Sequence, residues 1–187
     1  MAPRLGALFA YGIALLSLAY AAVFVLTGTA IAADPFANVL LALSGVLATA
    51  ATVAVSDLLP DRPGRWIRIV GVGGALLSAT HGMQAAIASA QGLATDPLSA
   101  TDPRGFATFG LAGLWTLVVG GTIVRGATPF PVRLGWLAVV AGVNLLALFV
   151  ATAAGLAALV PVTAVLAAVV LGPAFWVWTG RVLEGVR

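Results

Sequence analysis

The chain has 187 residues, of which 61% are hydrophobic and only 8% are charged, and its formal net charge at pH 7 is +3. This composition excludes an ordinary soluble domain and is typical of an integral membrane protein. The nine basic residues are all arginines scattered between apolar runs, which excludes a clustered nucleic-acid surface, and the absence of cysteine excludes disulfides and thiolate metal sites.

The first predicted element is an apolar helix over residues 5–29. With Arg4 before it and Ala30-Ile31-Ala32 after it, this run imitates a secretory signal peptide with its cleavage site. The apolar run is about 25 residues long, whereas the apolar part of a signal peptide has roughly 7–15 residues. We therefore expect a retained first membrane span.

Five further apolar runs are long enough to cross the ~30 Å hydrocarbon core of a bilayer as helices, which close their own backbone hydrogen bonds. They cover residues 36–57, 66–91, 104–125, 131–153 and 157–180. Three runs are preceded by a side chain that can cap a helix and by a proline whose missing N–H costs nothing there, at Asp34-Pro35, Asp102-Pro103 and Thr128-Pro129. The sequence therefore predicts a single domain over residues 1–187, an all-α bundle of six transmembrane helices.

The arginines predict the orientation of this bundle. In a six-helix topology Arg104 falls on one side and the other eight fall on the side of the chain termini: Arg4, Arg62, Arg65, Arg68, Arg125, Arg133, Arg181 and Arg187. Because positive residues accumulate in cytoplasmic loops, we expect both termini in the cytoplasm and a multi-pass protein of the cytoplasmic (inner) membrane.

The third predicted span, residues 66–91, carries the only histidine, His81. At about 100° per residue, His81 shares a polar arc with Gln84 and Gln91. Small residues at intervals of four gather on nearly the opposite face: Gly74, Ser78, Gly82, Ala86 and Ala90. We expect this helix to be central, with neighbours on both faces.

Several polar and aromatic residues are predicted to reach mid-membrane depth. His81 follows Arg68 by 13 residues, or about 20 Å of helix, and Asn144 follows Arg133 by 11 residues, or about 16 Å. The predicted ligand-binding residues of a modest cavity at this depth are Ser17, His81, Gln84, Trp115 and Asn144. The alternative interpretation is that these side chains only form hydrogen bonds between helices.

No pattern indicates catalysis, a metal or a cofactor. A metal site needs several His, Cys, Asp or Glu side chains together, and His81 stands alone in the predicted bilayer region. Acid–base catalysis needs a second positioned group, and no carboxylate is predicted inside the spans. Asp57 lies beside Arg62, Arg65 and Arg68, where we expect an interfacial ion pair.

The segment from Gly172 to Leu183, with Pro173, spaced aromatic residues and Gly180-Arg181, resembles the closing helix of small six-helix bacterial membrane proteins of unknown function. In length and helix number the chain is also similar to the substrate-binding S components of energy-coupling-factor vitamin transporters. Ala10 and Ala14 fit the Ala-x-x-x-Ala element by which that family packs against its coupling subunit. The first resemblance implies the fold alone, and the second implies vitamin binding.

The leading functional hypothesis is a non-enzymatic membrane protein that binds or passes a small molecule, as in ligand binding or transport. The alternative is an accessory or assembly subunit of a larger membrane complex. An S component, or an enzyme acting on a lipid-soluble substrate, ranks third. The expected partners are membrane lipids, a small-molecule ligand, and a membrane protein or a second copy of the chain.

Overall fold

The computed structural model describes residues 3–96, 98–126 and 128–186, and for residues 29, 30, 32 and 61–64 it describes the backbone alone. Over these residues the fold is all-α, as predicted, with no β-strand. The described helices form six long segments. Five of them are long and apolar enough to cross a membrane, and the third, which carries His81, is not among these five.

Three of the six segments are uninterrupted helices near the N-terminus, and they lie within a few residues of the expected runs. They are α1 (Pro3–Thr27), which is followed by a 3-10 turn, η1 (Gly28–Ala33), then α2 (Pro35–Ser56) and α3 (Asp61–Ala90).

The remaining three segments include two that contain a π-helical turn. The fourth segment joins α4 (Pro103–Gly105), η2 (Phe106–Leu111) and α5 (Ala112–Val124), and the fifth is α6 (Val132–Ala153). The sixth joins α7 (Leu159–Val165), η3 (Leu166–Leu171) and α8 (Gly172–Gly185). Both π turns, η2 and η3, were absent from the sequence prediction.

Two predicted helix starts are confirmed in atomic detail. The Asp34 carboxylate accepts a hydrogen bond from the backbone N–H of Ala37 at 2.7 Å, and proline follows Asp34 at the first helical position. The Asp102 carboxylate accepts from the N–H of Arg104 at 2.8 Å in the same manner. Each cap satisfies one of the N–H groups that a helix start leaves without a partner.

Two other starts differ from the prediction. Thr128 does not cap the fifth segment, because α6 begins only at Val132, and the buried Thr128 hydroxyl has no partner among the described residues. The third segment begins at Asp61 rather than at residue 66. Its first turn includes Pro63, which is tolerated there because first-turn N–H groups have no intrahelical acceptor.

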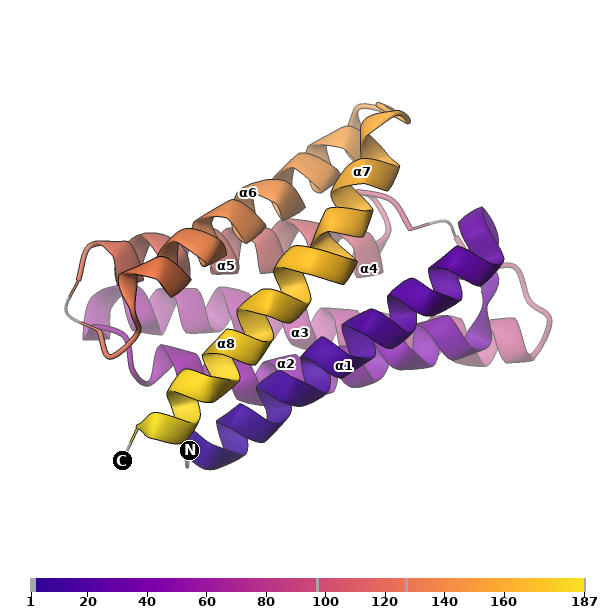
Figure 1. Cartoon of the computed structure of the whole chain (residues 1–187). Helices are drawn as coiled ribbons and strands as arrows, with labels where there is room; N and C mark the ends of the chain where they lie inside the picture. The colour runs from indigo at the N-terminus through magenta and orange to yellow at the C-terminus, as the bar shows by residue number, and fades with distance from the viewer. Residues whose placement is uncertain (1–2, 97, 127, 187) are drawn as a thin grey trace.

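The six segments form a ring in chain order, in which each packs against its neighbours and α8 returns to α1. Figure 1 shows both chain ends at the same end of the bundle, which we call the terminal end. The opposite end carries the connections over residues 28–34, 91–102 and 154–158. The contact between α6 and α8 is far less extensive than those of α2 with α3 and of α5 with α6.

Glycines bring the two most closely packed helix pairs together. A Cβ atom at Gly45 of α2 would lie 2.7 Å from backbone atoms of Ala75 and Ala79 in α3. A Cβ atom at Gly142 of α6 would lie 2.5 Å from the backbone nitrogen of Leu117 in α5. These helices therefore approach at backbone distance, as the small-residue rows of the sequence predict.

The main hydrophobic core lies toward the terminal end and draws on α1, α2, α3, α5, α6 and α8. At its centre Trp115 of α5 stacks on Trp176 of α8, with ring centroids 5.8 Å apart and planes 13° apart. Phe175 meets both indole rings edge to face. This aromatic cluster joins helices that are not neighbours in the ring and fills the middle of the bundle.

Candidate functional site

The two predicted site residues of α3 differ in their exposure. Gln84 is exposed and His81 is half-buried, whereas the neighbouring Ser78 and Gly82 are buried. The Ser78 hydroxyl lies 3.2 Å from that of Thr108 in η2, which fixes the small-residue face against the fourth segment. The expectation of a central third helix is therefore wrong, because α3 is one member of the ring, packs through its small-residue face and leaves Gln84 outside.

Trp115, by contrast, is only 3% exposed and belongs to the aromatic core. Its indole packs directly on Gly71 of α3, where a Cβ atom would lie 2.7 Å from the ring nitrogen. The indole N–H is buried without a hydrogen-bond partner among the described residues. Trp115 thus packs in the interior, on the part of α3 around Gly71.

Asn144 and Ser17 occupy two further environments. The Asn144 side-chain amide donates to the backbone carbonyl of Thr163 at 2.9 Å and so ties α6 to α7. Ser17 is half-buried on α1, and α2 lies between α1 and α3 in the ring. No described hydrogen bond joins any two of the five predicted residues.

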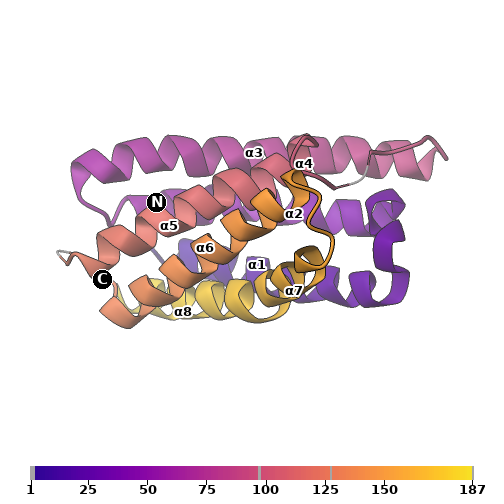
Figure 2. The same ribbon diagram turned by 90° about the horizontal axis from the view of Figure 1, so that it is seen from above.

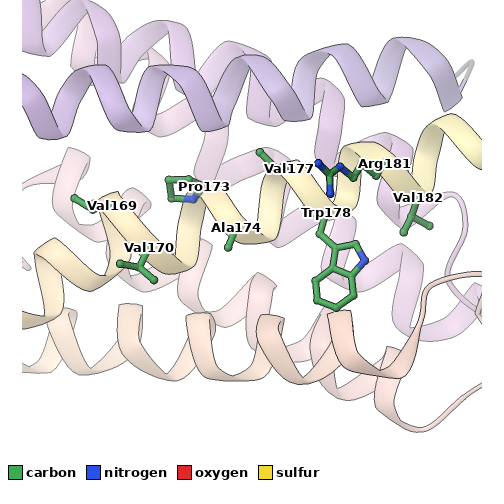
Figure 3. A pocket seen from close by; sticks show the side chains of 8 residues that line it. All are labelled: Val169, Val170, Pro173, Ala174, Val177, Trp178, Arg181 and Val182. Carbon is green, nitrogen blue, oxygen red and sulfur yellow. The ribbon is translucent and has the colours of Figure 1, made fainter.

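A different concave surface runs along the outer face of η3 and α8 (Figure 3). It has a volume of about 770 Å³. Its lining residues fall in two rows at intervals of four residues, which are Val169, Pro173, Val177 and Arg181, and Val170, Ala174, Trp178 and Val182. Figure 3 shows the second row turned toward α6 and Arg181 at one end of the groove. We call this surface the α8 groove.

The α8 groove combines an apolar length with one cationic end. Between Val169 and Arg181 the helix advances 12 residues, or about 18 Å, which is close to the ~15 Å depth of one bilayer leaflet. Arg181 is exposed and forms no described ion pair, while Glu184 interacts with the Tyr11 hydroxyl on α1. The groove therefore offers apolar contacts over about 18 Å and an exposed guanidinium near one end.

The strongest polar network of the described residues lies at the opposite end of the bundle. Arg104 is only 2% exposed and binds the Asp102 carboxylate at 2.9 and 3.1 Å, the Asn38 side chain at 2.8 Å and the backbone carbonyl of Asp96. Asn38 in turn donates to the backbone carbonyl of Asp34 at 3.0 Å. The N–H donors of Arg104 thus bind acceptors of the protein itself, so this network stabilises the fold and is not a ligand site.

This network was not predicted from the sequence, where Arg104 served only to predict the orientation of the bundle. A signal was present, since a single arginine next to a capping aspartate on the arginine-poor side needs a local partner. The contribution of Asn38 had no comparable signal. At the terminal end, Arg68 pairs with Asp57 as the sequence predicts.

Among the described residues no group of three or more His, Cys, Asp or Glu side chains could hold a metal ion. No protein-family model, curated protein or solved structure matches the chain. Its function is therefore inferred from the geometry of its own residues.

Proposed function

We propose that the chain is a six-span protein of the cytoplasmic membrane that binds an anionic amphiphile of the inner leaflet in the α8 groove, without chemical conversion. The ligand class is a molecule with an anionic head and at least one long apolar chain. The observation that supports this proposal is the position of Arg181 near one end of the two apolar rows that line the groove.

The membrane orientation is supported by where the charged residues lie. The exposed arginines Arg4, Arg65, Arg125, Arg133 and Arg181 all belong to the helix ends that lie at the terminal end. Arg104, at the other end, is buried in its network. Arg187 lies outside the described residues, and the Arg62 side chain is not described. The positive-inside rule then puts the terminal end in the cytoplasm. Because both chain ends lie at one end of the bundle, the number of spans must be even, so α3 is counted as a span beside the five apolar helices.

The topology has a direct test, because the chain lacks cysteine and single cysteines can be introduced. A membrane-impermeant thiol reagent applied to intact cells should label Leu98→Cys in the connection after α3. It should label Pro129→Cys, an exposed position in the connection between the fourth and fifth segments, only after the cells are opened. Labelling of Pro129→Cys in intact cells would contradict the orientation.

Binding in the α8 groove is supported by its shape and chemistry. The valines and Pro173 present an apolar strip to an acyl chain, and such burial contributes about 0.8 kcal/mol per CH₂ group removed from water. Within a bilayer the apolar strip gives no preference, because lipid tails are equally apolar. Selection for an anionic headgroup therefore depends on Arg181, where one cation near the membrane surface contributes about 1 kcal/mol, or roughly a fivefold preference.

Trp178 lines the groove and can report its occupant. We would place the protein in phosphatidylcholine vesicles with a fixed small fraction of lipid brominated on its chains, since bromine quenches nearby indoles. The difference in quenching between wild type and Trp178→Phe isolates the Trp178 signal. Brominated phosphatidylglycerol should quench this signal several-fold more effectively than brominated phosphatidylcholine.

Arg181→Gln should abolish that preference. Arg133→Gln, which removes an exposed arginine outside the groove, should retain it. Competition with unbrominated fatty acid or with inorganic phosphate distinguishes a single-chain ligand, a phospholipid and a free anion. Equal quenching by both brominated phospholipids in the wild type, or a preference that survives Arg181→Gln, would contradict the proposal.

A second candidate function, an accessory or assembly subunit, is favoured by one observation. Gln84 is exposed, and α3 is not among the five helices that are apolar enough to cross a membrane, so its outer surface suits a protein partner better than lipid.

A further inference from the structure

An exposed carboxylate, Glu184, lies next to Arg181 at the cationic end of the α8 groove. At about 100° per residue, Glu184 falls within the arc of the first lining row on the surface of α8. It follows Arg181 by three residues, a spacing that puts their Cβ atoms about 5–6 Å apart. Both side chains are exposed, so the groove ends in a cation and a carboxylate side by side.

Arg181 and Glu184 are neighbours that do not pair with each other. No ion pair between them is described. Glu184 instead interacts with the hydroxyl of Tyr11 on α1. Tyr11 can approach α8 closely because residue 180 is a glycine. A Cβ atom at Gly180 would lie 2.7 Å from Cε1 of Tyr11 and 2.9 Å from its Cζ, the carbon that carries the hydroxyl. The carboxylate is therefore engaged by α1, and Arg181 is left for another anion.

We propose that the amphiphile of the α8 groove carries a hydrogen-bond donor beside its single anionic group, as a phosphodiester lipid with a hydroxylated headgroup does. The Arg181 guanidinium has only donors and binds the phosphate. The ionised Glu184 has only acceptors and binds the headgroup hydroxyl. A carboxylate offers about four lone-pair sites, so the interaction with Tyr11 leaves others for the ligand. An anionic headgroup without a donor meets only repulsion from Glu184.

This inference rests on the proposed binding of an anionic amphiphile in the α8 groove. Within that function Arg181 selects anionic over zwitterionic headgroups, whereas Glu184 selects among anionic headgroups. Tyr11 is a positioning residue, because it acts through Glu184. The two selections are measured with different pairs of lipids, so a failure of this inference is distinguishable from a failure of the proposed function.

The test compares two anionic lipids that differ in headgroup hydroxyls. Phosphatidylglycerol and phosphatidylmethanol are both phosphodiesters with one negative charge, but only phosphatidylglycerol has hydroxyl donors. With bromine on the chains of each lipid and the Trp178 signal as the readout, the wild type should prefer phosphatidylglycerol about threefold, the effect of one hydrogen bond at an exposed site.

Glu184→Ala should reduce this ratio to about one and should not weaken the preference of either anionic lipid over phosphatidylcholine. The matched control is Asp96→Ala, which removes an exposed carboxylate at the opposite end of the bundle and should retain the threefold ratio. Thermal melts should show that Glu184→Ala keeps the stability of wild type, since the side chain is exposed.

Tyr11→Phe tests the positioning role, because it removes only the hydroxyl and lets Glu184 pair with Arg181 at the i, i+3 spacing of a helix. The preference for both anionic lipids over phosphatidylcholine should fall about twofold. In the Glu184→Ala background the same change should have no effect. A hydroxyl that served only the packing of α1 on α8 would act equally in both backgrounds.

Each further outcome counts against the inference. A wild type that prefers both anionic lipids equally over phosphatidylcholine would leave the proposed function standing and overturn the role of Glu184. A threefold ratio that survives Glu184→Ala would overturn it as well. Equal quenching by all three lipids would contradict the proposed function and with it the selection by Glu184.

Discussion

The guanidinium of Arg104 donates a hydrogen bond to the Asn38 side-chain oxygen at 2.8 Å, although the two residues are 66 positions apart in sequence. This contact joins the first turn of α2 to the start of the fourth segment. Through Asp96 and Asp102 it also fixes the connection that follows α3. The buried Arg104 side chain thus connects α2, the connection after α3 and the fourth segment at the end of the bundle farthest from the hydrophobic core.

Arg104→Met should lower the free energy of unfolding by about 3–5 kcal/mol, because it leaves the buried Asp102 carboxylate without its charge partner. Chemical denaturation in detergent measures this loss. In the double variant Arg104→Met/Asp102→Asn the amide is neutral and its oxygen can still cap the helix, so part of the stability should return. If Arg104→Met is as stable as wild type, the network does not stabilise the fold.

Gly45→Ala tests the backbone contact between α2 and α3. The added Cβ atom would lie 2.7 Å from the α3 backbone, so the helices must separate, and we expect a loss of about 1–3 kcal/mol. The control is Gly121→Ala in α5, where nothing lies within 4 Å of the Cβ position. That change should be neutral or stabilising by up to about 1 kcal/mol, because alanine favours helix over glycine. Thermal melts that rank the two variants in reverse would refute this close packing.

Thr179→Val should leave the protein at least as stable as wild type. Thr179 is 1% exposed and its hydroxyl has no described hydrogen-bond partner, so the isosteric valine removes an unsatisfied polar group. Thr116 is also buried, but its hydroxyl donates to the Ala112 carbonyl at 2.7 Å. Thr116→Val should therefore cost about 0.5–1.5 kcal/mol. A loss of stability in Thr179→Val equal to that of Thr116→Val would show that Thr179 has a partner.

The helix positions could be read from the sequence because their causes are local. Apolar length and capping aspartates before proline act within a few residues, and Asp34 and Asp102 behave accordingly. The same local reasoning failed at Thr128, where two prolines at positions 129 and 131 delay the helix to Val132. The π turns were not predictable, since each depends on packing against other segments.

The candidate site was harder to predict because periodicity gives two faces of a helix but not which face is inside. In α3 the small residues proved to be the packing face, since glycines such as Gly82 allow closer contact than His81 could. The small extent of the contact between α6 and α8 could not be predicted from the sequence either, because it depends on how all six segments pack in the ring. This limited contact leaves the α8 groove open.

His81→Leu should change the stability of the monomer by no more than about 0.5 kcal/mol, because the side chain is half-buried and forms no described hydrogen bond. Ser78→Leu, three residues earlier in the same helix, is the matched comparison at a buried position. Ser78 is 7% exposed and packs against Thr108, so the larger side chain should cost about 1–3 kcal/mol. Denaturation of both variants as detergent-solubilised monomers measures the difference. A strongly destabilised His81→Leu would place the imidazole inside the bundle.

Asn144→Leu should loosen the sixth segment where α7 passes into the π turn η3. The Asn144 amide donates to the Thr163 carbonyl, which also accepts from the backbone N–H of Leu166. Losing this interhelical bond should cost about 0.6–1.7 kcal/mol. Hydrogen exchange should rise in peptides covering residues 163–171.

The control is Thr122→Val, because the Thr122 hydroxyl bonds only to the Val118 carbonyl of its own helix. This variant should leave exchange in residues 163–171 unchanged. The π turn lies at one end of the α8 groove, so a loosened η3 should also reduce the quenching of Trp178 by brominated phosphatidylglycerol. Unchanged exchange in Asn144→Leu would mean that the π turn is held by its own backbone and by packing against α1 and α6, without the side-chain amide.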